Sequence, residues 1–178
     1  MNRRRLLQGM VLTAPGVLLM ANPSLGFASV SESRNLSFRH LHTNEKLSIE
    51  YFSDNQYQHE SLNKLNYLLR DFRSSEVYQI DPKLFDLLYT IKLVTGSKGH
   101  FEIISGYRSP NTNNMLRSKS NGVAKRSLHM QGKAVDIRLT DVSTDSVRRA
   151  AIALKVGGVG YYKRSNFVHL DTGRFRTW

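Results

Sequence analysis

The stretch "SLHMQGKAVDIRL", residues 127–139, joins a candidate turn to a candidate strand. After Gly132, every second residue from 135 to 139 is apolar, which is the pattern of a strand with one buried face. Asp136 then projects from the opposite face, where a rigid strand can present a carboxylate to a ligand. Gly132 allows the chain to fold back, so that His129 can approach Asp136.

A second stretch, "SNFVHLDTG" at residues 165–173, places Phe167, His169 and Asp171 on one strand face. Together with His129 and Asp136, His169 would complete a set of two imidazoles and one carboxylate. That set is typical of catalytic zinc sites, which keep a fourth position for water. The spacing by itself also fits a loop that leads into an ordinary strand.

The rest of the chain predicts strands and helices around these two stretches. A hairpin is expected over residues 36–52, helices over residues 58–73, 81–96 and 143–155, a short helix after Ser109, and strands over residues 101–104, 133–139, 159–161 and 166–171. Residues 117–127 form a polar, basic loop, and no internal repeat interrupts the pattern. The expected fold is one α+β domain, in which a small antiparallel sheet carries the metal site and is flanked by helices.

Residues 1–28 have the layout of an export signal. A basic head precedes a run of twelve residues, 10–21, that contains Pro15, and small residues end the segment at Ala28. A membrane-spanning helix needs about 20 apolar residues, so no permanent membrane anchor is expected. Cleavage after Ala28 would leave a domain of residues 29–178 in the periplasm.

The basic head favours the twin-arginine export machinery over the general secretory route. Consecutive arginines precede Leu6 and Leu7 as in twin-arginine signals, whereas Asn2 stands where Ser or Thr is usual. Loss of this segment removes three arginines and no acid, which lowers the formal charge from +12 to +9. Such a surplus favours nucleic acid, anionic lipid or an acidic wall polymer as surroundings. Export argues against nucleic acid.

The absence of cysteine excludes disulfides, a thiol nucleophile and thiolate metal sites. Any metal must therefore be held by His, Asp or Glu. His40 and His42 in the predicted hairpin are further candidates, although a histidine beside a turn is more often solvated or hydrogen-bonded.

The run Ser127, His129, Gly132, Ala134 and Asp136, followed downstream by His169, resembles the signature of the M15-type zinc peptidases. Their fold is shared with D-alanyl-D-alanine peptidases and the hedgehog signalling domain. "SGYRS" at residues 105–109 is similar to the family's arginine-bearing turn. The motifs "NTNN", "GVAK", "GGVGYY", "RSNFVH" and "DTG", and a terminal tryptophan, extend the likeness to periplasmic murein endopeptidases of this family across nearly the whole chain.

This resemblance implies that His129, Asp136 and His169 bind zinc and that Arg108 faces the site. A fixed guanidinium there would stabilise the oxyanion that forms when water attacks a peptide carbonyl. Zinc itself lowers the pKa of bound water to about 7 and polarises the carbonyl.

The chain departs from the family pattern at the expected general base: many M15 enzymes carry Glu or Asp three residues before the last histidine, where this chain has Asn166. The nearest carboxylate is Asp171, which shares a strand face with His169 and is the expected base. It can alternatively hydrogen-bond a ligand histidine, or cap the turn at Thr172 and Gly173.

Two residues near the metal stretch are candidates for substrate binding. Ser127 can hydrogen-bond the substrate or cap its own loop, and Tyr107 can line the cleft or pack in the core. The cluster of Lys125, Arg126 and Lys133 is a solvated face by default, but it also suits a peptide stem with outward carboxylates.

The expected function is that of a zinc-dependent murein endopeptidase, which hydrolyses peptide cross-links between peptidoglycan stem peptides. By resemblance, these links join D-alanine to meso-diaminopimelate or two diaminopimelates to each other, and their cleavage serves wall growth. Two rivals remain: a D,D-carboxypeptidase that trims stem peptides, and a non-catalytic metal-containing module that binds murein.

Overall fold

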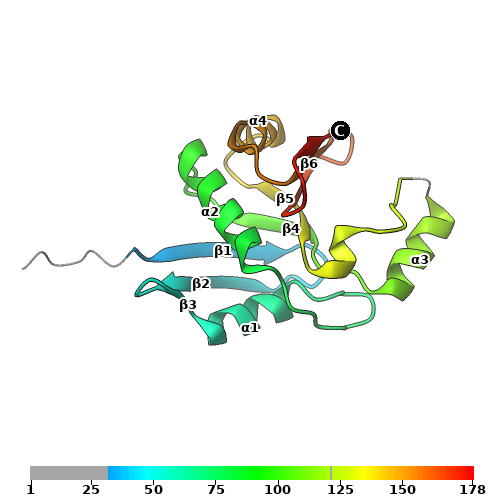
Figure 1. Cartoon of the computed structure of the whole chain (residues 1–178), viewed down its shortest axis with the longest axis horizontal. Coiled ribbons are helices and arrows are strands. Elements are labelled where there is room, and N and C mark those ends of the chain that lie inside the picture. Colours follow the sequence, from blue (N-terminus) through cyan, green and yellow to red (C-terminus); the bar gives the residue numbers. More distant parts are fainter. Residues whose placement is uncertain (1–31, 121) are drawn as a thin grey trace, which may run out of the picture. The chain divides into compact units, whose positions relative to one another are not determined.

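The alternating stretch after Gly132 forms strand β5 (Ala134–Leu139), an interior strand of the sheet (Figure 1). Its apolar residues, Val135, Ile137 and Leu139, are buried in the core, as the alternation predicts. Asp136 therefore lies on the other face. The computed structural model describes residues 32–120 and 122–178, and the predicted export signal at residues 1–28 lies outside them.

The described chain begins and ends with three strands in succession, and its helices lie between them. The elements before β5 are β1 (Arg34–His40), β2 (Lys46–Ser53), β3 (Gln56–Tyr57), α1 (His59–Leu68), α2 (Pro82–Thr95), β4 (Phe101–Ser105), α3 (Pro110–Lys119) and the 3-10 turn η1 (Leu128–Gln131). Those after it are α4 (Thr144–Leu154), β6 (Gly158–Tyr162), β7 (Phe167–Asp171) and β8 (Arg176–Thr177). The predicted α+β class is confirmed.

Within the described residues, the strands form one sheet of eight, in the order β3-β2-β1-β4-β5-β7-β6-β8. Four strands lie around the site, in the order β4-β5-β7-β6. The three pairs that they form with one another are antiparallel, as predicted. The sheet is wider than expected and mixed, because β1 pairs in parallel with β4, and β8 with β6. Short β3 and β8 have no periodic signal, so the sequence did not predict them.

One hydrophobic core lies between the inner face of the sheet and helices α1, α2 and α4. The helix α2 begins and ends as predicted: the Asp81 side chain accepts a hydrogen bond from the Lys83 N–H, and Gly96 ends the helix with a φ of 66°. Helix α2 contacts α4 (Figure 1). No helix in the described ranges is long and apolar enough to span a membrane.

Helix α1 is shorter than the predicted helix over residues 58–73. It ends at Leu68 because the chain turns to bury the carboxylate of Asp71. That carboxylate accepts hydrogen bonds from the backbone N–H of Arg73, at 3.0 Å, and of Ser109, at 2.9 Å. The bond to Ser109 thereby ties the turn after α1 to the segment that carries Arg108, just before α3.

Candidate metal centre

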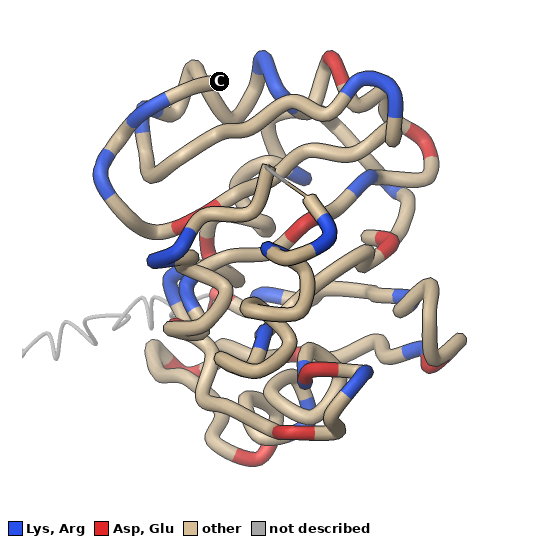
Figure 2. The backbone as a smooth tube through the Cα atoms, turned by 90° about the vertical axis from the view of Figure 1, so that its right-hand side faces the viewer, with Lys and Arg blue, Asp and Glu red and all other residues tan. Residues whose placement is uncertain are grey.

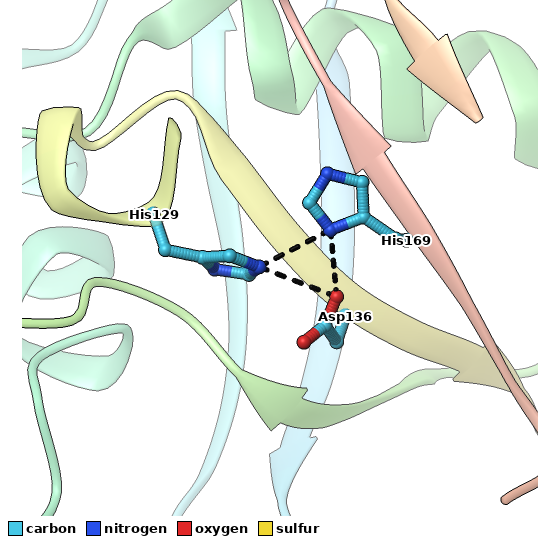
Figure 3. A group of neighbouring side chains, drawn as sticks. All are labelled: His129, Asp136 and His169. Carbon is cyan, nitrogen blue, oxygen red and sulfur yellow. Dashed lines mark hydrogen bonds and ion pairs between the residues drawn. The ribbon is translucent and has the colours of Figure 1, made fainter. Parts of the chain in front are cut away.

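Three buried side chains, two from residues 129–136 and one from β7, meet on the outer face of the sheet (Figure 3). The Nε2 atom of His129 lies 3.1 Å from Nδ1 of His169 and 3.3 Å from Oδ1 of Asp136. The same oxygen lies 2.9 Å from Nδ1 of His169. Among the described residues, these three form the group of His, Asp and Glu side chains that can share a metal ion.

Strand register brings Asp136 and His169 together. Asp136 of β5 pairs directly with His169 of β7 in the antiparallel ladder, so both side chains leave the same face. The neighbouring pair, Ala134 and Asp171, extends this face by one step. The sequence placed each residue on its strand face, and the pairing of β5 with β7 aligns the two.

His129 arrives from the 3-10 turn that precedes β5. Gly132 ends this turn with a φ of 64°, and a Cβ atom there would lie 2.1 Å from the carbonyl oxygen of Gln79. The Nδ1 atom of His129 is 2.7 Å from the carbonyl oxygen of Gly106, to which it donates its proton. With Nδ1 bonded to Gly106, Nε2 is the ring nitrogen that faces Asp136 and His169 and is available as a metal ligand.

The residues of this group shift one another's pKa values. Burial alone would raise the pKa of Asp136, but the charge of His129 and hydrogen bonds from both histidines hold it well below its ordinary value. Burial lowers the pKa of His169, yet its hydrogen bonds with Asp136 and Asp171 outweigh that effect and raise it to about 8. Asp136 is therefore a stable anion facing the two imidazoles.

The donor set fits zinc. Each side chain offers one atom, and the second nitrogen of each imidazole is already bonded elsewhere, to Gly106 or to Asp171. Ligands about 2.0–2.1 Å from a tetrahedral ion lie about 3.3 Å apart, close to the three separations observed. Two imidazoles and one carboxylate also leave a fourth position open, as catalytic zinc sites require.

The group lies in a cleft of about 420 Å³. Arg108 lines it, with Nη2 4.0 Å from Oδ2 of Asp136. The buried Nε of Arg108 has no hydrogen-bond partner in the described structure, and its Nη1 makes a long contact of 3.4 Å with Asn113. The guanidinium of Arg108, which lies in the cleft beside the metal group, is suited to bind an anionic oxygen.

Asp171 does not line this cleft. It is completely buried, and it accepts hydrogen bonds from the backbone N–H of Gly158 and Gly173, at 2.9 and 2.8 Å. Arg176 donates two more, at 3.1 and 2.7 Å, and His169 Nε2 lies 3.1 Å away. Burial would raise the pKa of Asp171, but the bonds from His169 and Arg176 keep it far below its usual range. A buried carboxylate with a lowered pKa is a poor proton acceptor, so this geometry favours the alternative in which Asp171 hydrogen-bonds a ligand histidine.

Asn166 has a local role away from the metal group. It has a φ of 52° in the turn between β6 and β7, a conformation that asparagine tolerates better than most residues. Its Oδ1 accepts a hydrogen bond from Thr144 at the start of α4. The residue thus fixes a turn, and its side chain is held by a helix end.

The two predicted substrate-binding residues differ in their positions. Ser127 lines the cleft, and its hydroxyl makes no capping bond to the 3-10 turn, so the capping alternative is not supported. The structure does not bring Tyr107 into the cleft: its buried ring stacks on Tyr78, with centroids 4.7 Å apart. The packing alternative holds for Tyr107.

Positive charge dominates the cleft. Lys and Arg positions are spread over several elements on the side that carries α3 (Figure 2). The described residues that line the cleft include Arg108, Arg126 and Arg176 but a single acidic side chain, that of Asp136. The cleft is therefore suited to a substrate that bears carboxylates.

His40 and His42 lie in the β1–β2 hairpin, outside the metal group. His40 is completely buried, and its Nδ1 accepts hydrogen bonds from the backbone N–H of His42, at 3.2 Å, and of Thr43, at 3.3 Å. Burial lowers its pKa to about 4. Neutral His40 is thus a structural residue of the turn.

We expect His40 to make the folded protein less stable in mild acid. The unfolded chain binds a proton at His40 below about pH 6.5, whereas the folded chain does so only near pH 4, so the free energy of unfolding falls between these values by about 3 kcal/mol. Urea unfolding of the metal-free protein at pH 7.5 and pH 4.5 measures this loss. His40→Asn, which keeps an acceptor for the turn, should lose less; equal losses in both proteins would contradict the assignment.

The sequence did not single out two residues of the C-terminal segment that line the cleft. These residues are Arg176 and Trp178. Arg176 forms an ion pair with Asp171 through two hydrogen bonds. The ring centroid of Trp178 lies 5.2 Å from that of His169. A usable signal was present in "GVG" at residues 158–160, because two glycines on one strand face indicate that another group occupies the space.

A family model and several known relatives match this chain over almost its full length. The model of the Peptidase_M15_2 family, described as peptidoglycan L,D-endopeptidase MepK, matches residues 28–178. The peptidoglycan L,D-endopeptidase MepK of Escherichia coli strain K12 is 43% identical over 177 residues, which cover 99% of this chain and 97% of that protein. The probable peptidoglycan L,D-endopeptidase MepK of Haemophilus influenzae is 43% identical over 166 residues, or 93% and 89% of the two chains. Among solved structures, the L-Ala D-Glu endopeptidase ChiX of Serratia marcescens matches 64% of this chain and 87% of that chain, with 21% identity and a TM-score of 0.37.

Proposed function

Because the chain belongs to the Peptidase_M15_2 family of peptidoglycan endopeptidases, we propose that it is a zinc-dependent murein endopeptidase that hydrolyses cross-links between stem peptides. The bond favoured is the L,D-type link between two diaminopimelate residues, in line with the L,D-endopeptidase relatives. Cleavage of such links opens the wall mesh during growth.

The observation that carries this proposal is the convergence of three ligand atoms within a basic cleft. Nε2 of His129, Oδ1 of Asp136 and Nδ1 of His169 would hold the zinc ion, and all three side chains are buried. A zinc ion in such a site polarises a peptide carbonyl and lowers the pKa of water.

The protein's own residues then bind and orient the substrate. Arg108, whose guanidinium lines the cleft beside Asp136, would donate hydrogen bonds to the oxyanion that develops at the attacked carbonyl. Ser127, on the cleft wall, would hydrogen-bond the peptide. Arg126 would add positive charge that attracts stem-peptide carboxylates, whereas the charge of Arg176 is already paired with Asp171.

We assign Asp171 a positioning role in place of the base. Its contact with Nε2 of His169 fixes the tautomer in which Nδ1 is free to bind metal. The ion pair with Arg176 keeps Asp171 itself in place. The carboxylate thus orders the ligand without meeting the substrate.

Residues 1–28 are proposed to direct export through the twin-arginine machinery, which would place residues 29–178 in the periplasm with the murein. This assignment rests on the sequence pattern alone. Mass spectrometry of the protein from the periplasmic fraction, with and without a functional twin-arginine translocase, would identify both the route and the cleavage site.

Removal of the metal is expected to abolish cleavage. Wild-type protein incubated with isolated cross-linked muropeptide dimers should release monomers, and a chelator should stop the release because the triad alone cannot activate the carbonyl. Restoration by added zinc completes the test. Chromatography of the muropeptides before and after incubation measures each step.

The choice of substrate separates the alternatives. Dimers linked through two diaminopimelates should yield monomers, whereas a linear pentapeptide should keep its terminal D-alanine. Loss of D-alanine without dimer cleavage would identify a D,D-carboxypeptidase. Binding of murein with intact dimers in the presence of zinc would identify a non-catalytic module.

A further inference from the structure

The site face of strand β6 has no side chain at two successive positions. Gly160 pairs directly with His169 of β7, so Gly158 and Gly160 share the face of the metal group. A Cβ atom at Gly160 would lie 2.6 Å from the indole of Trp178, and one at Gly158 would lie 2.4 Å from Oδ2 of Asp171 and 2.5 Å from Nη1 of Arg176. Gly160 thus leaves space that Trp178 fills, and Gly158 leaves space for the ion pair of Asp171 with Arg176.

The final residue, Trp178, is held at this place by three hydrogen bonds. Its backbone N–H donates to the Val159 carbonyl at 3.2 Å, and its carbonyl oxygen accepts from the Tyr161 N–H at 3.0 Å. The indole N–H donates to the hydroxyl of Tyr162 at 3.1 Å. The guanidinium of Arg176 lies 4.9 Å from the ring centroid. The indole is therefore fixed in one orientation.

Although it is held in place, Trp178 is 51% exposed, and it is one of the residues that line the cleft. Tyr162 and Phe167 line the same cleft, and their rings stack with centroids 4.4 Å apart. Large apolar side chains that are ordered yet exposed at a binding cleft mark a contact surface for a ligand. We call Trp178, Tyr162 and Phe167 the aromatic wall.

We propose that Trp178 is a specificity-determining residue, whose indole contacts the hydrocarbon side chain of the stem-peptide residue next to the cleaved bond. This proposal rests on the proposed function and adds the substrate group that the aromatic wall binds. A diaminopimelate side chain is a run of methylenes that ends in charged groups. Its methylenes match the indole face, and its carboxylate matches the arginines of the same cleft.

Substitution of Trp178 should weaken substrate binding more than it slows chemistry. For cleavage of cross-linked dimers, we expect Trp178→Ala to raise KM by about tenfold or more while kcat changes less, because the lost contact is made in both the ground state and the transition state. Trp178→Phe should keep part of the contact. Gly160→Ala should raise KM as well, because the added Cβ displaces the indole.

Phe175→Ala is the matched control. Phe175 is an exposed aromatic residue, three positions from the chain end, that does not line the cleft. It should keep wild-type KM, and zinc content should be unchanged in Phe175→Ala, Trp178→Ala and Trp178→Phe. A KM for Trp178→Ala within twofold of the Phe175→Ala value would overturn the proposal.

The chain has a single tryptophan, so fluorescence reports on this residue alone. Titration of the zinc-loaded protein with monomeric product muropeptides should change the emission of Trp178 saturably. No change at monomer concentrations that inhibit dimer cleavage would refute the contact. Failure of the wild-type protein to cleave any dimer would instead refute the proposed function, and the titration would still decide whether Trp178 meets stem peptides.

Discussion

Asp136→Ala is expected to abolish both zinc binding and the release of monomers from cross-linked dimers. Asp136 supplies the only carboxylate among the three candidate ligand atoms, and its Oδ1 lies within 3.3 Å of both histidine nitrogens. Without it, two imidazoles face a basic cleft that offers no replacement anion among its described lining residues. Metal affinity and turnover should therefore be lost together.

Metal analysis and thermal melting test this prediction independently of activity. Zinc at 100 times its Kd stabilises a folded protein by about 2.7 kcal/mol, so the wild type should melt at a higher temperature with zinc, and Asp136→Ala should show no such shift. Asp145→Ala, which removes an exposed carboxylate paired with arginines on α4, is the control and should keep zinc and activity. An Asp136→Ala protein that retains about one zinc per chain would contradict the ligand assignment.

Local periodicity predicted the strand face from which each site residue of β5 and β7 projects. The alternation in residues 135–139 placed Asp136 opposite the core, and the alternation in "NFVHLD" placed His169 and Asp171 on one face. A period of two is an intrinsic property of a strand, so a short segment is enough to reveal it. The turn at Gly132 was predictable from a different local signal. Glycine readily adopts the positive φ that this turn needs.

The parts that were not predictable depend on contacts between distant segments. The burial of Asp171 results from Arg176 and two backbone N–H groups that converge from different segments, and no local pattern records that convergence. Trp178 enters the cleft through a two-residue strand, too short to show a period. Helix α1 ends early because Asp71 bonds to Ser109, 38 residues away.

Asp171→Asn is expected to weaken zinc binding by about 10-fold to 100-fold, and excess zinc should restore dimer cleavage. All groups around the Asp171 carboxylate are donors, so an amide NH₂ would oppose at least one of them and disturb the hold on His169. The zinc-free variant should be less stable by about 3 kcal/mol, so assays belong below its unfolding transition. A general base has a different signature, because its loss lowers kcat at every zinc concentration.

Asn166→Asp provides the complementary test of where a base acts. It puts a carboxylate three residues before His169, but that side chain belongs to the turn that bonds Thr144, so turnover should stay at the wild-type level. The measurement is dimer cleavage across a zinc titration for wild type and both variants. If Asp171→Asn binds zinc normally and stays inactive with zinc in excess, Asp171 takes part in the chemistry and the positioning role is wrong. If zinc restores its turnover, the buried carboxylate acts through His169.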